Sequence, residues 1–290
     1  MGELIIERNL SMDKKKKVNL NFHKSFNPDF EYIAKIVQIA DNCEGLTKEE
    51  ISELTGIPTG VSSGKVEPHI DYAKLMNLID FKKEGSKFYI YSTSLGKLIQ
   101  SEDLYFLENL SKLVCGYFLT SKIYGAPMWY EIIRGMSYKY GNEIKESVIV
   151  KDLSEKFNIK INMTPFRSCY KNKESLASLN LINIEEVDNE DLVIFNKNTY
   201  DDENIYVYAY TLIKDLEGLD NNRKEFSINE IFENIAWQRG FCWDEEVAMM
   251  ILEKLNDLNI ITLNRQLNPI TVIINTKSED IVNEIYSLLI

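Results

Sequence analysis

The run Ser62-Ser63-Gly64-Lys65 places two small hydroxyls, a glycine and a lysine just before a predicted helix. Backbone N–H groups and the positive end of the helix dipole point outward at such a position, so the run is suited to hold a phosphate group. Its spacing is too loose for the Walker A motif of nucleotide hydrolases. We expect His69 and Lys74 to share one exposed face of the following helix with Lys65.

Further cations fall in two groups, one on a predicted hairpin after this helix and one on a later helix: Lys82, Lys83, Lys87, Arg167, Lys171 and Lys173. Together with Ser62, Ser63, Lys65, His69 and Lys74 they form the predicted DNA-binding set. The run Lys14 to Lys17 could add phosphate contacts from a flexible leader. The alternative for all of them is an ordinary solvated surface.

Signatures of common hydrolases are absent from the sequence, which contains no P-loop, no GxSxG and no HExxH. With only 2 histidines, His23 and His69, a histidine-rich metal centre is excluded. His23 lies between Phe22 and Phe26, and we interpret it as a packed histidine rather than a general base. The sequence assigns no catalytic residue.

DNA cleavage would need carboxylates that hold Mg²⁺ or Mn²⁺, since no other cluster here could activate water at neutral pH. The densest acids lie in two turn-like stretches: Asp188, Glu190, Asp191, Asp201, Asp202 and Glu203. Acids in turns are usually solvated, so we predict no metal-ligand set and no other cofactor.

The elements around the phosphate-binding run predict a winged helix. Thr47 and Glu50 form a capping box at the start of a helix, and Gly56, Pro58 and Gly60 end it. A second helix begins near Gly64 to Pro68, and a hairpin follows at 78–81 and 88–91. The second helix of such a unit usually enters the major groove, although a winged helix can also serve only protein–protein contacts.

Three helix ends share one pattern, an apolar end followed by Asn and a β-rich run: LMNLIDF (75–81), LASLNLINI (176–184) and LNDLNIITL (255–263). The repeat predicts a mainly α-helical fold with small β-hairpins (α+β), an N-terminal winged helix-turn-helix, further winged-helix-like units and connecting helices. The predicted divisions are a leader (1–20), the winged helix (21–100), a helical connector (101–145), a second unit (146–200) and an acidic C-terminal unit (201–290). Aromatic residues of the connector, including Trp129 and Tyr138, are interpreted as core.

The net charge of −12 is unevenly distributed. Residues 1–100 contain as many basic as acidic side chains, so 101–290 carry the whole excess, most of it in 201–290. Phosphate repels such an acidic region, so we expect DNA contacts to lie N-terminal to it. The 4 dispersed cysteines and the lack of a long apolar run predict a cytoplasmic protein without a membrane partner.

Several short motifs of the sequence resemble those of one known family. The stretch Phe22-His23-Lys24-Ser25-Phe26 resembles the Phe-x-Gly-His-Glu-Thr-Phe opening of the domain of unknown function 4007 family. Other similar motifs follow in the same order across 20–260: KLMNLI, Thr93-Ser94-Leu95-Gly96-Lys97, Asp103, Met128-Trp129-Tyr130, Arg167-Ser168-Cys169-Tyr170, LASLNLI and Arg239-Gly240-Phe241. The family-motif residues singled out here are His23, Phe26 and Trp129.

The resemblance implies a DNA-binding component of a bacterial DNA phosphorothioation-type modification and anti-phage defence system. The implied partners are double-stranded DNA, a P-loop ATPase, an ATP pyrophosphatase-like protein and a cysteine desulfurase. One branch of such systems uses a protein of this type to nick DNA for sulfur insertion. Two positions depart from the family: Lys24 stands where the family favours Glu, and Gln238 where it favours Pro. If the family's His-Glu pair is catalytic, Lys24 removes its acid from this chain. The alternative is an interaction scaffold or transcription regulator built from winged helices without catalytic activity.

Overall fold

The computed structural model describes residues 20–60, 64–266 and 268–289, and they form an α+β fold with small antiparallel sheets. The predicted α+β class is therefore confirmed. Three three-stranded sheets have the same strand order, β1-β3-β2, β4-β6-β5 and β7-β9-β8. Each sheet with its neighbouring helices is called a unit here: the first unit spans 30–92, the second 143–195 and the third 225–274.

The first unit begins with α1 (Phe30–Ile39), followed by β1 (Cys43–Thr47) and α2 (Lys48–Thr55). It continues through α3 (Val66–Leu75) into the hairpin of β2 (Ile79–Glu84) and β3 (Lys87–Ser92). The predicted capping box is present: the Thr47 hydroxyl accepts a hydrogen bond from the Glu50 N–H, and the Glu50 carboxylate accepts one from the Thr47 N–H. Strand β1 was not predicted.

Helices connect the first and second units: α4 (Ser94–Glu102), α5 (Asn109–Leu119), α6 (Pro127–Tyr130), a π-helical turn (Glu131–Met136) and α7 (Ser137–Tyr140). The second unit then contains β4 (Glu143–Lys145), α8 (Glu146–Phe157), α9 (Thr164–Lys171), a short 3₁₀ turn (Ala177–Leu179), β5 (Ile182–Val187) and β6 (Glu190–Phe195).

The third unit follows a short 3₁₀ turn (Asp202–Asn204) and the long helix α10 (Ile205–Leu219). It contains β7 (Glu225–Ser227), a π-helical turn (Glu230–Asn234), a 3₁₀ turn (Trp237–Phe241), α11 (Glu245–Asp257), β8 (Ile261–Asn264) and β9 (Thr271–Ile274). The last helical elements are α12 (Ser278–Ile281) and a 3₁₀ turn (Val282–Glu284). A continuous helical stretch covers 228–234, and the π-helical turn forms most of it.

Two local features repeat between units. Asn77, Asn180 and Asn259 each follow a helical end in the left-handed conformation, with φ of 60°, 50° and 56°. Asn tolerates this conformation better than most residues, which explains why it recurs before each hairpin. Ser227 and Glu230 bond to each other in the third unit as Thr47 and Glu50 do in the first.

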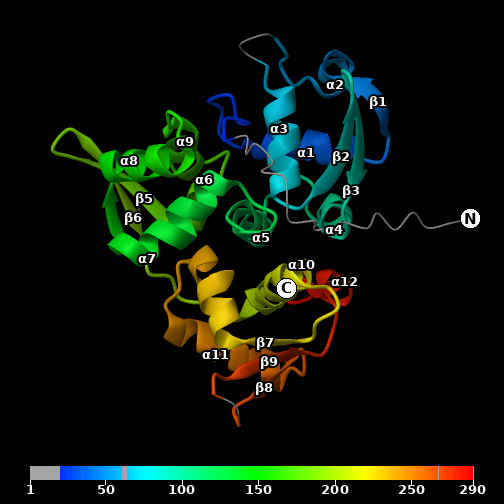
Figure 1. Cartoon of the computed structure of the whole chain (residues 1–290). Helices are drawn as coiled ribbons and strands as arrows, with labels where there is room; N and C mark the ends of the chain where they lie inside the picture. Colours follow the sequence, from blue (N-terminus) through cyan, green and yellow to red (C-terminus); the bar gives the residue numbers. More distant parts are fainter. Residues whose placement is uncertain (1–19, 61–63, 267, 290) are drawn as a thin grey trace, which may run out of the picture.

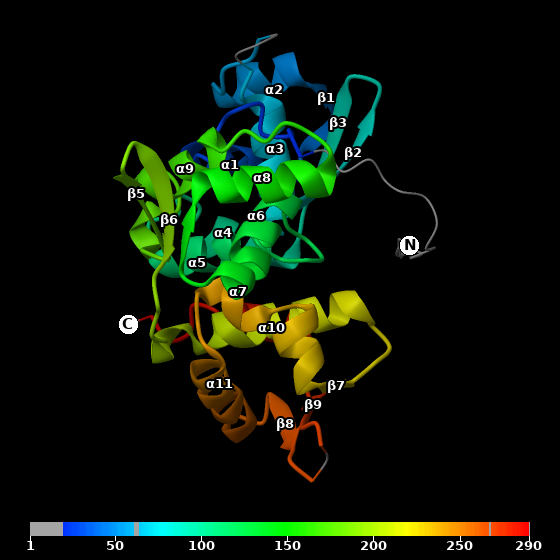
Figure 2. The same ribbon diagram turned by 60° about the vertical axis from the view of Figure 1, so that its left-hand side comes forward.

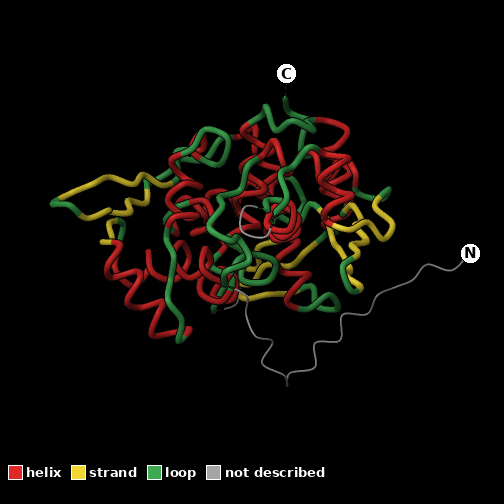
Figure 3. Tube along the Cα trace, turned by 90° about the horizontal axis from the view of Figure 1, so that it is seen from above, coloured by secondary structure: helices red, strands yellow, loops and turns green. Residues whose placement is uncertain are grey.

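The three units surround α5. Figure 1 shows the first unit at upper right, the second at left and the third below, with α5 between them, and Figure 2 shows the same arrangement from another side. In the view from above, helices occupy the middle while the β1–β3 and β5–β6 strands lie at opposite edges (Figure 3). The helix suits this place because Val114, Cys115, Tyr117, Phe118 and Leu119 are all fully buried.

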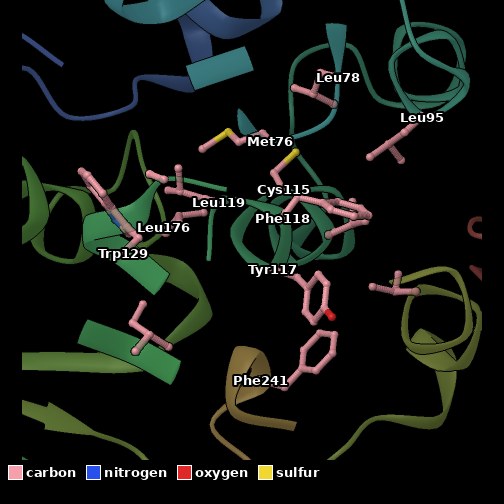
Figure 4. Packing of buried hydrophobic residues seen from close by; sticks show 14 of the residues in the cluster. Met76, Leu78, Leu95, Cys115, Tyr117, Phe118, Leu119, Trp129, Leu176 and Phe241 are labelled. Carbon is pink, nitrogen blue, oxygen red and sulfur yellow. The ribbon is translucent and has the colours of Figure 1, made fainter. Parts of the chain in front are cut away.

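Side chains from all three units meet on this central helix. Figure 4 shows Met76 and Leu78 of the first unit, Leu176 of the second and Phe241 of the third around Cys115, Tyr117 and Phe118. The rings of Tyr117 and Phe241 stack with centroids 4.9 Å apart. Burying so much apolar surface against one helix ties the units into a common core.

Candidate nucleic-acid interface

The most exposed part of the predicted lysine set is the tip of the β2–β3 hairpin. Lys82, Lys83 and Lys87 lie there with one acid, Glu84. The Lys82 side chain is 71% exposed and pairs with Glu84, while the Lys83 ammonium lies 2.8 Å from a Glu67 oxygen. The tip therefore carries an excess of positive charge and projects from the sheet edge (Figure 1).

Glu67 on α3 joins two lysines. The Lys24 ammonium lies 2.5 Å from one of its carboxylate oxygens, and Lys83 contacts the other. These hydrogen bonds lower the pKa of Glu67 to about 2. Lys74 is likewise paired, with its ammonium 2.5 Å from Asp80. Lys24, which replaces the family's Glu, thus has a structural partner, and two of the predicted DNA contacts are already compensated by acids.

His69 does not lie on an exposed face, so its prediction as a DNA contact is wrong. Its side chain is 1% exposed. The ring Nδ1 lies 2.7 Å from the Lys65 carbonyl oxygen, and Nε2 accepts a hydrogen bond from the Asp29 N–H at 3.3 Å. Burial lowers its pKa to about 4, so the ring is neutral and joins α3 to the start of α1.

Helix α3 is also unsuited to enter a major groove. Tyr72 is fully buried, its hydroxyl donates to the Phe26 carbonyl at 2.8 Å, and its ring packs against Phe22 and Trp129. The partly exposed polar positions within the helix are Glu67, Asp71 and Lys74. Burial and the nearby Glu67 raise the pKa of Asp71 to about 6. The helix therefore offers two acids and one paired lysine where a groove-reading helix needs donors.

The predicted phosphate-binding run is only partly covered, because Ser62 and Ser63 lie outside the described residues. Lys65 is half-buried, with its ammonium 4.9 Å from the Tyr32 ring centroid and 5.6 Å from that of Phe26. Its backbone N–H donates to the Pro58 carbonyl, and Pro68 has no N–H to offer. The predicted leader, with Lys14 to Lys17, falls outside the described part except for Leu20.

The second cationic group is compensated as well. The Arg167 guanidinium lies 2.6 Å from Glu146 and 3.2 Å from Asp191, and the Lys171 ammonium lies 3.5 Å from Asp191. Lys173 is exposed after the end of α9. Of this group, Lys173 is the cation best placed to meet a phosphate.

Two of the family-motif residues, His23 and Trp129, pack together, whereas the Phe26 ring lies beside the Lys65 ammonium. His23 is 2% exposed, and its ring centroid lies 6.2 Å from that of Trp129. Its Nδ1 accepts a hydrogen bond from the Ser25 N–H, and burial lowers its pKa to about 4. The cluster holds the stretch 20–26 against α3 and α6, which agrees with the interpretation of His23 as a packed residue.

The acids that are densest in the sequence have partners within the chain. Glu190 accepts from the Ser147 N–H, Asp191 pairs with Arg167, and Asp202 pairs with Lys254. Asp201 accepts from the Glu203 N–H at the start of a 3₁₀ turn. Across 20–60, 64–266 and 268–289, no three His, Cys, Asp or Glu side chains lie together as a metal site would require. The described residues thus do not fit a resident Mg²⁺ or Mn²⁺ ion bound by three such side chains.

Sequence reasoning missed a second polar surface, where the second and third units meet. Tyr138, predicted as core, is 75% exposed, and the Arg239 guanidinium carbon lies 4.2 Å from its ring centroid. Both residues line a cleft of about 280 Å³. The two positions are far apart in the chain, and the sequence signals near this cleft were the motif Arg239-Gly240-Phe241 and the neighbouring Gln238.

The motif glycines have packing roles. A Cβ at Gly96 would lie 1.9 Å from the Leu78 carbonyl oxygen, so only glycine lets α4 approach β2 so closely. A Cβ at Gly240 would lie 2.8 Å from the Tyr117 ring and 2.9 Å from the Arg134 guanidinium. The two glycines that match the family motifs are therefore explained by close packing in the fold, without reference to any activity.

Comparison with known proteins gives a fold but no family. No family model matches the chain, and no curated protein matches it. In the described segments, no helix is both long and apolar enough to cross a bilayer. A crystal structure of magnesium-ion-bound SspB is similar with a TM-score of 0.69 and 15% identity, over 93% of this chain and 86% of that one. A second SspB crystal structure is similar with a TM-score of 0.68 and 16% identity over the same shares. At these identities, the likeness shows that this chain shares the SspB fold over nearly all of its length.

Proposed function

We propose that this chain is a DNA-binding component of a bacterial DNA phosphorothioation-type modification and anti-phage defence system. The observation that carries the proposal is the exposed lysine tip of the β2–β3 hairpin, with Lys82, Lys83 and Lys87 against Glu84. The motif resemblance in chain order and the likeness to the SspB fold support the same assignment.

We infer that the order α1-β1-α2-α3-β2-β3, with the sheet order β1-β3-β2, is that of a winged helix. The β2–β3 hairpin is then its wing, and the wing rather than α3 contacts DNA. The acids paired with Lys82 and Lys83 do not prevent this, since exposed ion pairs are worth about 0–1 kcal/mol. A DNA phosphate can replace Glu84 or Glu67 at small cost and release counterions as it binds.

Duplex binding at several salt concentrations tests the proposal. A DNA-binding component loses affinity steeply as salt rises, because each phosphate contact releases counterions. Absence of duplex binding at low salt would overturn the proposal.

A second candidate, an interaction scaffold, is favoured by one observation. The α3 side chains that a groove-reading helix would expose are buried against residues 20–26 and Trp129. The acidic region 201–290 also suits protein rather than DNA partners. In the proposed system these partners are the ATPase, the ATP pyrophosphatase-like protein and the cysteine desulfurase. Stable complexes with those proteins, without any salt-dependent duplex binding, would select the scaffold.

A further inference from the structure

The cleft between the connecting helix α7 and the third unit has features of a built binding site. It has a volume of about 280 Å³ and lies where α7 and the end of β6 meet the 3₁₀ turn Trp237–Phe241 and the start of α11. The exposed ring of Tyr138 and the exposed Lys197 line it, together with the buried Trp243. It therefore combines an accessible aromatic face, a cation and an apolar wall.

Arg239 holds the aromatic face in place. Its Nη1 donates to the Arg134 carbonyl at 2.9 Å, while its guanidinium lies over the Tyr138 ring. Partial burial lowers the pKa of Arg239, and no carboxylate of the described residues forms an ion pair with it. A guanidinium on an aromatic ring is a common platform for stacking bases.

Gln238 lines the same cleft and has an unsatisfied acceptor, Oε1, which a ligand reaches only when the side chain turns toward the cleft. Its side chain is 2% exposed, and its Nε2 donates to the Phe232 carbonyl at 3.1 Å. Its Oε1 is buried without a hydrogen-bond donor among the described residues. A buried acceptor without a donor costs free energy, so a ligand that brings an N–H group would gain from meeting it.

The charges of the lining argue for a neutral ligand group. Lys197 and Arg239 are balanced by Asp244 and Glu245, so the cleft does not favour an isolated phosphate. Asp244 accepts a hydrogen bond from the Val247 N–H at the start of α11. With only two carboxylates and two cations beside them, a divalent cation is disfavoured as well. A neutral planar group with an N–H donor fits best.

Backbone strain marks the same turn. Ala236 and Cys242, on either side of Trp237–Phe241, have φ of 50° and 57°. The left-handed conformation costs a residue other than glycine roughly 1–2 kcal/mol. Such strain is often found at binding sites, where the surrounding packing fixes it.

We propose that this cleft binds one nucleobase of a DNA strand, packed against Tyr138 and hydrogen-bonded through an N–H group to Gln238. The proposal rests on the proposed DNA-binding function and names a second point of DNA contact, distinct from the wing. Much of the cleft lining belongs to the acidic region 201–290, which repels phosphate, so the cleft takes the uncharged base while the phosphates of the strand stay outside it. Its volume suits a single base rather than a base pair, so the base must come from single-stranded DNA or leave the stack of a duplex.

A comparison of two short single-stranded DNAs tests the site on the full chain. One is an oligodeoxyadenylate, and the other has the same backbone but abasic sugars. We expect the first to bind about tenfold more tightly, the effect of one base–aromatic stack. Tyr138→Ala should abolish this preference without loss of folding, because the ring is 75% exposed. Tyr105→Ala, at a 70% exposed tyrosine outside the cleft lining, is the matched control and should keep the preference.

A second comparison examines Gln238 with two strands that carry either adenine or unsubstituted purine, which lacks the amino donor. We expect the wild type to bind the purine strand more weakly than the adenine strand. The Gln238→Met variant should bind the two strands with equal affinity. Equal affinity for adenine-bearing and abasic strands, or a Tyr138→Ala variant that keeps the preference, would overturn the base site. If the wild type still binds duplex DNA with a salt-dependent affinity, only the cleft proposal fails. If it binds no DNA at all, the proposed function itself fails.

Discussion

The Arg134 guanidinium and the Asp215 carboxylate form an ion pair 3.4 Å long in which both side chains are fully buried. The Tyr117 and Ser121 hydroxyls donate to the carboxylate at 2.6 and 2.7 Å, and Arg134 also donates to the Ile235 carbonyl at 2.9 Å. The network joins α5, α10 and the two π-helical turns. It is satisfied within the chain, so we assign it to the fold rather than to chemistry.

Removing one side of this pair should destabilise the protein strongly. Asp215→Ala leaves the Arg134 charge buried without a partner, and we expect a loss of about 3–5 kcal/mol in the free energy of unfolding. Urea unfolding followed by circular dichroism measures it. Lys35→Ala, which breaks the exposed pair with Glu31, is the control and should cost less than about 1 kcal/mol. Equal losses in both variants would contradict the structural role of the buried pair.

The repeated left-handed asparagines allow a second test of stability. Asn259 is exposed and has a φ of 56°, so Asn259→Ala should cost roughly 1 kcal/mol while Asn259→Gly should be neutral or slightly stabilising. The measurement is the thermal unfolding of both variants and of the wild type, from which the change in stability is obtained. If alanine were tolerated as well as glycine, the recurrence of Asn before the hairpins would need another explanation.

His69 predicts a dependence of stability on pH. Its pKa in the folded chain is lowered to about 4 from an ordinary 6.5, so between these values the unfolded chain binds a proton that the folded chain does not. This contribution to stability is complete above pH 6.5 and is lost as the pH falls towards 4. Asp71, whose pKa is raised to about 6, acts in the opposite direction between 6 and 3.8.

The two effects can be separated by substitution. His69→Gln should flatten the decline between pH 6.5 and 4 by about 1–3 kcal/mol, whereas Asp71→Asn should steepen it. The measurement is urea unfolding across this pH range. A His69→Gln profile parallel to that of the wild type would show that the imidazole does not titrate as its burial requires.

Nicking is the activity that the family resemblance raises. Lys24 stands where the family favours Glu, and the neighbouring His23 is buried, so we expect the chain alone to leave supercoiled plasmid intact with Mg²⁺ or Mn²⁺. Gel electrophoresis measures the conversion of supercoiled plasmid to relaxed circles, with and without a chelator. The experiment is then repeated with the partner proteins present. Relaxed circles that disappear on chelation would show a metal-dependent nickase and overturn this expectation.

Local signals in the sequence predicted much of the fold. The capping box at Thr47 and Glu50, the hairpin alternation and the turn at Glu84-Gly85-Ser86 depend on neighbouring residues, and each is present. Strands β1, β4 and β7 were missed because they are short and form only by pairing with distant strands, as Cys43 does with Ile90.

The candidate sites were harder to predict for a similar reason. The sequence places Lys65, His69 and Lys74 on one helix, but it does not show that Tyr72 and His69 face residues 20–32 and Trp129. Acids that pair with Lys74, Lys83 and Arg167 also come from other elements. The contact between Tyr138 and Arg239 depends on how two units pack, which no local pattern encodes.

The most direct test of the account is the salt dependence of duplex binding by a variant with Lys65, Lys82, Lys83 and Lys87 changed to Ala. A control variant removes the same charge elsewhere, at the exposed Lys151, Lys160, Lys224 and Lys277. We predict weaker binding by the first variant and a slope of log affinity against log salt that flattens by about one unit per lost phosphate contact, with the control close to the wild type. Equal slopes and affinities for the wild type and the first variant would contradict DNA binding through this surface.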